Sequence, residues 1–396
     1  MRLMSDAEVP LRRLWTGVLC GYLALGATLQ ELPGYAVATF GAGPATTGLL
    51  VGVAFAAAAS TRPFAGRAGD AGRARAVVLA GGVLTSMAAA GHLFAPDVGT
   101  LLVARLLMGI GEGMLFSASL PWVLAAAPAD RRGRVSGWFG LSMWGGLTLG
   151  PLLAVVLHDI GGARAVWGAV IALPVVSAVL AATTRRPPPL ADPVPIRPRS
   201  WREVLPRGAG LPGLCLGMAA YGYGSLTALL VLYLSDGIGG QNLGLAVFAV
   251  AFLLTRSLGS PLVDRYGGAV VARIVLLVEC AGLTLLATVP TEFFALLGAA
   301  ITGVGIGTIF PATTAMTLQR TGAIRPGTAV GSITSLWDLG ILAAGPIGGV
   351  VAAHFGYRPA FALAAGVAIV ACGLTFVLVR DAKPVDIPPV MARNRS

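Results

Sequence analysis

The sequence has few charged residues, three histidines and four cysteines. Charged residues make up 11% of the 396 positions, whereas they make up about a quarter of a typical soluble domain. Hydrophobic residues make up 56% and the mean hydropathy is +0.81, which predicts an integral membrane protein. The cysteines form no CxxC or Cys/His pair, so neither a disulfide framework nor a zinc site is indicated. We expect no metal site and no cofactor.

Acidic residues are scarcer than basic ones, at 17 against 28, which gives a formal net charge of +11. The arginines cluster between hydrophobic segments and are not interleaved with aromatic residues, so we expect no nucleic-acid partner. The histidines lie near the ends of these segments, and neither G-x-S-x-G nor H-E-x-x-H occurs. These absences argue against an intramembrane enzyme.

Hydrophobic stretches long enough to cross a bilayer, which takes about 20 residues in a helix, occur twelve times. They cover residues 14–36, 44–64, 76–94, 99–126, 135–157, 165–184, 211–234, 242–262, 271–289, 293–318, 328–353 and 359–379. An even number of spans puts both termini on one side, where 25 of the 28 basic residues then lie. Because arginine and lysine stay cytoplasmic when loops are short, we predict a multi-pass cell (inner) membrane protein with both termini in the cytoplasm.

A segment rich in proline and arginine separates the first six spans from the last six. Such a segment lacks the apolar content needed to pack into a bundle and favours extended conformations. We therefore predict an N-terminal six-helix bundle at residues 1–184, a cytoplasmic linker at 185–210, and a C-terminal six-helix bundle with a short cytoplasmic tail at 211–396.

The two halves are copies of each other in a register of 194 residues. Arg62 recurs as Arg256, Asp70 recurs as Asp264, and the glycines at 109, 111 and 113 recur at 303, 305 and 307. A parallel duplication of six spans, with a substrate site between the halves, is one of the few known plans of secondary transporters. Duplicated loops also suit alternation between two faces better than the one-sided sensing of a receptor.

The loops after the second and eighth spans read "RPFAGRAGDAGRAR" and "RSLGSPLVDRYGG". They resemble the signature G-x-x-x-D-R-x-G-R of the major facilitator superfamily. Asp264 and Arg265 fit it, whereas the first loop keeps Gly66 and Asp70 but has Arg73 instead of an arginine directly after the aspartate. The resemblance implies a gating role for these residues, in which aspartate caps a helix or pairs with arginine and holds one face closed. Alternatively, the charges only fix the topology.

The fifth span contains "GGLTLGPLL" and the eleventh contains "GILAAGPIGG". Both resemble the G-x-x-x-G-P motif of proton-driven exporters in this superfamily, in which Gly150 and Gly345 would let helices pack closely and Pro151 and Pro346 would bend them. The alternative is ordinary packing, because glycine and proline are common in membrane helices. The resemblance implies an all-α membrane protein with twelve transmembrane helices in two pseudo-symmetric six-helix bundles, the major facilitator fold.

Charged residues inside the spans are candidates for the functional site, because a charge at mid-bilayer costs about 2.5–3.5 kcal/mol. Arg105 and Glu112 are seven residues apart, which places them on one face of a helix. We interpret them as a proton- or substrate-coupled pair, with a structural arginine–glutamate tie as the alternative. Asp338 has no basic partner in its own span and is predicted to serve proton coupling or cation recognition.

Two other acidic residues and several aromatic residues are further candidates. Glu31 is expected to face water or a cationic ligand, whereas Glu279 lies on a span that the resemblance places at the periphery. Aromatic side chains could shape a site for apolar ligands, although packing or interfacial anchoring would explain each one alone. The aromatic candidates are Trp144, Tyr221, Tyr223 and Phe310.

The sequence therefore predicts a secondary active transporter, a proton-coupled antiporter that exports a small, largely apolar compound such as a drug or natural product by alternating access. Its partners would be the small-molecule substrate, protons and the lipid bilayer, and it would work as a monomer driven by the proton gradient. The alternatives within transport are a proton-coupled flippase for a lipid-linked substrate and an importer of a sugar or other small metabolite.

Overall fold

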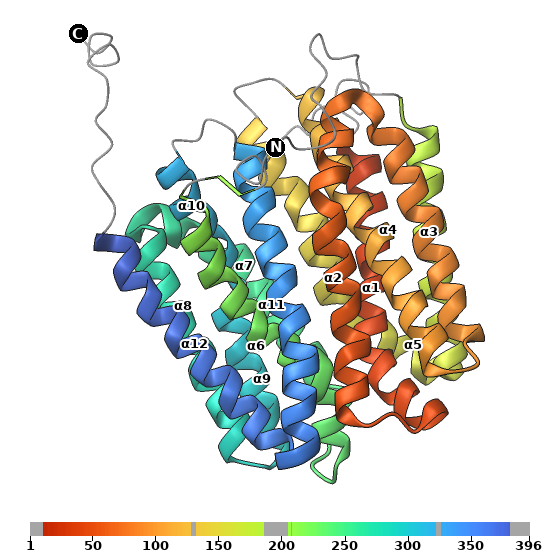
Figure 1. The fold of residues 1–396 in the computed structure, drawn as a ribbon, viewed down its shortest axis with the longest axis vertical. Helices are drawn as coiled ribbons and strands as arrows, with labels where there is room; N and C mark the ends of the chain where they lie inside the picture. The colour runs from red at the N-terminus through yellow and green to blue at the C-terminus, as the bar shows by residue number, and fades with distance from the viewer. Residues whose placement is uncertain (1–10, 128–131, 186–204, 207, 322–325, 381–396) are drawn as a thin grey trace.

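The computed structural model describes residues 11–127, 132–185, 205–206, 208–321 and 326–380, and every regular element in these ranges is a helix. In chain order they are α1 (Leu11–Phe40), α2 (Pro44–Ala68), the π-helical η1 (Gly69–Arg73), α3 (Ala74–Phe94), α4 (Val98–Ala125), α5 (Arg132–Thr183), α6 (Gly210–Ser235), α7 (Gly244–Tyr266), α8 (Gly268–Thr288), α9 (Glu292–Gly307), α10 (Ile309–Thr321), α11 (Pro326–Phe355) and α12 (Tyr357–Arg380). Helices α1–α5 form a first group, and α6–α12 form a second group beside it (Figure 1). The predicted linker falls mostly outside these ranges, so its boundaries stay a prediction.

The described helices supply the twelve predicted crossings. Nine described stretches are long and apolar enough to cross a membrane, and one of them, at residues 138–183 of α5, is long enough for two crossings. α5 is kinked between these crossings at Gly161 and Gly162, and Gly162 has a φ of 64°, which suits glycine. α1 and α7 are the two remaining crossings of the predicted twelve. α9 and α10 form a single crossing, broken at Thr308. The all-α, twelve-helix fold is therefore confirmed.

Glycines let equivalent helices approach closely in both groups. A Cβ on Gly109 of α4 would clash with the carbonyl oxygen of Ala54 in α2. A Cβ on Gly303 of α9 would lie 2.5 Å from the carbonyl oxygen of Phe248 in α7. Each residue of the second contact lies 194 positions after its counterpart in the first, so the sequence duplication is also a duplication of helix contacts.

The connection before α4 is fixed by a cap outside the predicted spans. The carboxylate of Asp97 accepts a hydrogen bond of 2.8 Å from the backbone N–H of Thr100, which satisfies one of the free donors in the first turn of α4. This hydrogen bond lowers the pKa of the exposed Asp97 from its ordinary value.

The two largest contacts between the groups form two seams. We call the contact of α2 with α11 the first seam and the contact of α5 with α7 the second seam. In the first seam the backbones touch, because a Cβ on Gly48 would clash with the carbonyl oxygen of Gly345, and the reverse is also true. The second seam is made by side chains, among them Trp144 and Phe252, whose ring centroids are 5.5 Å apart.

Candidate functional site

A buried ion pair crosses the first seam. Nε of Arg62 in α2 pairs with Oδ2 of Asp338 in α11, and Nη2 donates a second hydrogen bond of 3.2 Å to Oδ1. Arg62 is 8% exposed and Asp338 is 1% exposed. Removing one partner of such a buried pair costs about 3–5 kcal/mol in soluble proteins. The halves can therefore separate here only if the pair becomes hydrated or one charge is neutralised.

The same guanidinium reaches the interior of the first group through Tyr22 of α1. Nη1 of Arg62 donates to the hydroxyl of Tyr22 at 3.3 Å, and this hydroxyl donates to the backbone carbonyl of Glu112 in α4, also at 3.3 Å. Glu112 is 2% exposed, and its Oε1 has no hydrogen-bond partner among the described residues. The charges of Arg105, Arg62 and Asp338 act on its carboxyl group. We call these five residues the charge cluster.

Arg105 ties α4 to α2. Its Nε donates to the carbonyl oxygen of Leu50 at 2.9 Å, and its Nη2 donates to that of Val51 at 3.3 Å. Its Nη1 lies 3.3 Å from the sulfur of Met108, and the whole side chain is buried. No ion pair joins Arg105 to Glu112 in the described part of the chain. The structural tie at Arg105 thus runs to the backbone of α2 and not to the glutamate.

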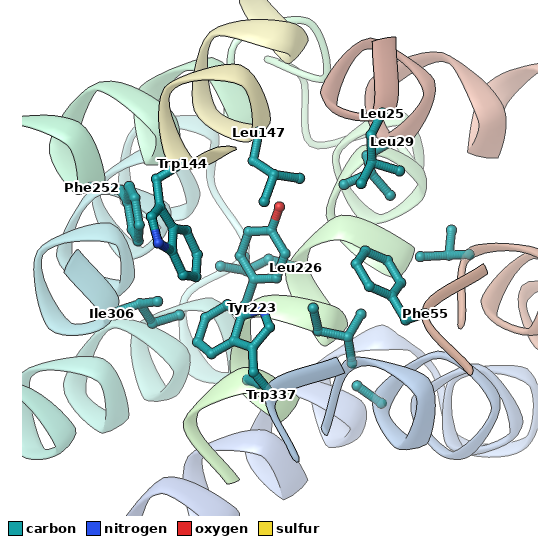
Figure 2. Packing of buried hydrophobic residues seen from close by; sticks show 14 of the residues in the cluster. Leu25, Leu29, Phe55, Trp144, Leu147, Tyr223, Leu226, Phe252, Ile306 and Trp337 are labelled. Atoms are coloured by element: carbon teal, nitrogen blue, oxygen red, sulfur yellow. The ribbon is translucent and has the colours of Figure 1, made fainter. Parts of the chain in front are cut away.

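Aromatic side chains fill the second seam and continue to α11. Trp144 contacts Phe252, Phe310 and Trp337, with ring centroids 5.5, 5.4 and 5.1 Å away. Tyr223 of α6 lies 5.6 Å from Trp337. Figure 2 shows Trp144, Tyr223 and Trp337 close together between the helices. We call these five residues the aromatic cluster; Trp144 comes from the first group and the other four come from the second.

Arg256 of α7 lies against the aromatic cluster. Its guanidinium carbon is 4.8 Å from the centroid of the Trp144 ring and 5.5 Å from that of Phe310. Cation–π contacts are worth about 0.5–2 kcal/mol, depending on how far they are shielded from water. Arg256 is 9% exposed, so this contact belongs to the interior of the protein.

Comparison with known proteins assigns this twelve-helix chain to a family. The family model of the Major Facilitator Superfamily matches residues 14–242 and 213–395. The chain belongs to the Major Facilitator Superfamily. It is a multi-pass membrane protein whose family and fold point to a transporter and not an enzyme.

Bacterial relatives of similar length support the same assignment. An uncharacterised MFS-type transporter of Salmonella typhimurium is 31% identical over 392 residues, which cover 95% of this chain and 98% of the relative. The uncharacterised MFS-type transporter YhhS of Escherichia coli is 30% identical over 93% of this chain and 91% of its own length. These relatives suggest the bacterial inner membrane as the location.

Solved structures of superfamily members share the fold at low sequence identity. A bacterial homologue of the human lysosomal transporter Spinster, in an inward-facing and occupied conformation, gives a TM-score of 0.77 over 94% of this chain and 96% of that chain, at 16% identity. The nucleoside transporter NupG gives 0.71 over 93% of this chain and 99% of its own, at 13% identity. Such likeness establishes the fold and leaves the substrate open.

In this superfamily member, Asp338 has the basic partner that its own span lacks. The partner is Arg62, which comes from the other half of the chain. Of the predicted aromatic residues, Trp144, Tyr223 and Phe310 belong to the aromatic cluster. Tyr221 is buried in α6, and its hydroxyl has no hydrogen-bond partner among the residues described. The functional roles of all these residues stay predictions.

Glu31 lies outside the charge cluster. Its Oε2 is 3.0 Å from Nδ1 of His158 in α5, whose side chain is 52% exposed. The neighbouring Gln30 donates from Nε2 to the carbonyl oxygen of Gln241 at 3.3 Å, and Gln241 precedes α7. Glu31 therefore meets a histidine of its own group, whereas Gln30 bridges the two groups.

Glu279 lies inside the second group, although its span was expected at the periphery. It is completely buried in α8, and within the described part of the chain neither carboxylate oxygen has a hydrogen-bond partner. A Cβ on Gly222 of α6 would clash with its Oε1, and a Cβ on Gly305 of α9 would clash with its backbone nitrogen. Glycines on two helices thus make room for this acid.

The glycines of the two exporter-like motifs pack helices closely. A Cβ on Gly150 would lie 2.5 Å from Cα of Gly26, so α1 and α5 touch beside Pro151. Gly345, beside Pro346, makes the backbone contact of the first seam. The predicted close packing is therefore present at both motifs, while their link to proton-driven export stays a prediction.

The two signature loops are only partly described. The side chains of Asp70 and Asp264 lie outside the described residues, so the predicted latch stays a prediction. Arg73 ends η1 and is exposed, and Arg265 is exposed near the end of α7. A Cβ on Gly66 would make only an ordinary contact with α4.

The sequence analysis did not predict the buried contacts of three residues, which are Arg62, Arg256 and Tyr22. A signal existed for the two arginines, because they recur at equivalent positions inside hydrophobic stretches, where a charge is costly. Tyr22 gives no such signal, since tyrosine is common near membrane interfaces. Only the packing of α1 against α2 and α4 brings its hydroxyl to Arg62.

Proposed function

We propose that this transporter is a proton-coupled antiporter that exports a small, largely apolar compound, such as a drug or natural product, by alternating access. The observation that carries the proposal is Glu112, a buried carboxyl group whose Oε1 lacks a hydrogen-bond partner among the described residues. Burial favours the protonated form of a carboxyl group, and nearby cations favour the ionised form. A movement that changes either influence would make Glu112 take up or release a proton.

The neighbours of Glu112 differ in how they would move. Arg105 is bound to the backbone of α2 and shares a helix with Glu112, so it stays in place when the halves separate. Arg62 is held by Asp338 of the other group. Opening of the first seam would therefore change the charges around Glu112, which couples alternating access to proton binding.

The aromatic cluster supports an apolar substrate. A ligand between the halves would meet aromatic rings from both groups, because Trp144 belongs to the first and Trp337 to the second. Rings contribute a large apolar surface, whereas a sugar importer would need many hydrogen-bonding groups at this place. The flippase alternative shares the apolar surface and differs in needing room for a lipid chain.

The arrangement in the membrane is part of the proposal. The first residue of α1 and the last residue of α12 lie at the same end of the molecule (Figure 1), as expected if both termini are cytoplasmic. We take residues 1–184 and 211–396 as the two moving bodies of a monomer, joined by a linker at 185–210.

Flux in proteoliposomes tests the proposed function. Compounds are first screened for those that raise the thermal stability of the purified protein, because a ligand of the folded state must stabilise it. We expect a hit to accumulate in vesicles with an acidic lumen while protons leave, and an uncoupler to abolish the accumulation. Flux that ignores the gradient would contradict proton coupling. Accumulation driven by an alkaline lumen would indicate symport, as the importer alternative requires.

A further inference from the structure

The two seams contain equivalent contacts of different chemistry. The register of 194 residues that relates the halves carries Arg62 onto Arg256, and it carries Trp144 onto Asp338. In the structure Arg62 pairs with Asp338 across the first seam, and Arg256 lies on Trp144 across the second. The same pair of duplicated positions thus forms an ion pair in the first seam and a cation–π contact in the second.

These two contacts differ in their response to a proton. Protonation of an aspartate removes its charge and with it the ion pair. Tryptophan has no ionisable group, and arginine keeps its charge at any physiological pH. Asp338 is 1% exposed and Trp144 is 2% exposed, so water does not compensate for the loss of either contact.

We infer that the first seam is a proton-operated gate, in which protonation of Asp338 releases Arg62 and lets α2 and α11 separate at this level. The contact of Arg256 with Trp144 contains no acidic group, so protonation cannot release it in this way. The inference rests on the proposed proton coupling and names the contact through which a proton moves the halves. The released guanidinium keeps a partner on its own side, because it already donates to Tyr22.

The backbone contact of the first seam indicates where the gate pivots. Gly48 lies 14 residues before Arg62 in α2, which corresponds to about 21 Å along the helix. Gly48 and Gly345 touch through their backbones, and nothing in this contact ionises. Release of the ion pair therefore opens the end of the seam at which α2 terminates, while the glycine contact holds the other end.

Asp338 has one direct polar partner among the described residues, and this partner belongs to the other half. Tyr22 of α1 and Glu112 of α4 act on the pair electrostatically. Three charged or titratable groups on helices that pack against α11 make contacts elsewhere. Tyr223 of α6 lies against Trp337, Arg320 of α10 donates to the carbonyl oxygen of Leu378, and Arg358 of α12 donates to that of Ala287.

Spin-label distances across each seam test the inference. Phe64→Cys with Leu339→Cys reports on the first seam, and Trp138→Cys with Leu258→Cys reports on the second; all four side chains are exposed. The four native cysteines are replaced by alanine. We expect a change from about pH 8 to about pH 5, which spans the titration of perturbed carboxyl groups, to lengthen the first distance and leave the second unchanged.

Variants at three positions extend the test. Asp338→Asn should hold the first seam at its low-pH distance at every pH, whereas the matched control Asp159→Asn, at an exposed position of α5, should keep the pH response. Trp144→Asp should give the second seam a pH response, and Trp144→Phe, which keeps a ring, should not. A first-seam distance that ignores pH in the parent protein, or a response that survives Asp338→Asn, would overturn the inference. These two results decide the matter even if Trp144→Asp does not fold.

The spin-label experiment tests the gate independently of the proposed function, because the distances are measured without substrate and without transport. A pH-responsive first seam without gradient-driven transport would reject proton-coupled export and keep the gate. Gradient-driven transport with a first seam that does not move with pH would reject the gate alone.

Discussion

Three buried arginines in the described part of the chain show three different kinds of contact. Arg62 pairs with a carboxylate, Arg105 donates to two backbone carbonyls, and Arg256 lies on an aromatic ring. The planar guanidinium with its five donors suits all three environments, whereas the compact and strongly hydrated ammonium of lysine does not. This difference accounts for arginine at positions where any charge is costly to bury.

Arg105→Lys is expected to lower the thermal stability of the protein. A single ammonium cannot replace both hydrogen bonds to Leu50 and Val51, and losing a hydrogen bond from a charged group costs about 1.5–3 kcal/mol. The midpoint of thermal unfolding in detergent, followed by intrinsic fluorescence, measures the effect. Arg12→Lys, at an exposed position of α1, is the matched control. Equal midpoints for the two variants would contradict the structural role of Arg105.

The sequence indicates which acids are functional candidates, and it does not show what each of them meets. Glu112 and Asp338 stand out because a charge inside a span is costly. The partner of Asp338 lies 276 residues away, so no local pattern could reveal it. The family resemblance places the span of Glu279 at the periphery, but the direction of its side chain depends on glycines of α6 and α9 that make room for it.

At the scale of the helices, length and hydrophobicity were enough to predict the twelve crossings, because each needs about 20 apolar residues. They did not predict the break at Thr308, since its neighbours Ile306, Ile309 and Phe310 are apolar. Pro311 offers the physical reason. It has no N–H to donate to the preceding turn, so it favours the start of a new helix two residues before it.

Gly48→Ala is expected to destabilise the first seam. The added Cβ would clash with the carbonyl oxygen of Gly345, and overpacking of this kind costs about 1–3 kcal/mol. Gly345→Ala should have a similar effect, and the double variant should cost less than the sum because both changes disturb one contact. Thermal unfolding measures all three variants against Gly34→Ala, whose Cβ would meet no atom within 4 Å. Fully additive effects would argue against a direct contact.

At the scale of the whole molecule, the two groups share their helix packing but differ in where charged residues lie. The contact of Gly109 with Ala54 is repeated in the second group. In contrast, the positions equivalent to Arg105 and Glu112 hold Ala299 and Ile306, which cannot carry a charge. The charge cluster therefore belongs to the first group and is completed by one residue from the second, which makes it sensitive to their relative movement.

The transport of a bound compound by Glu112→Gln is the most direct test of proton coupling through the charge cluster. Glutamine keeps the shape of glutamate and cannot ionise. The account predicts that this variant still binds the compound and exchanges it downhill, but does not accumulate it in proteoliposomes with an acidic lumen. Accumulation equal to that of the parent protein under the same gradient would show that Glu112 does not carry the coupled proton.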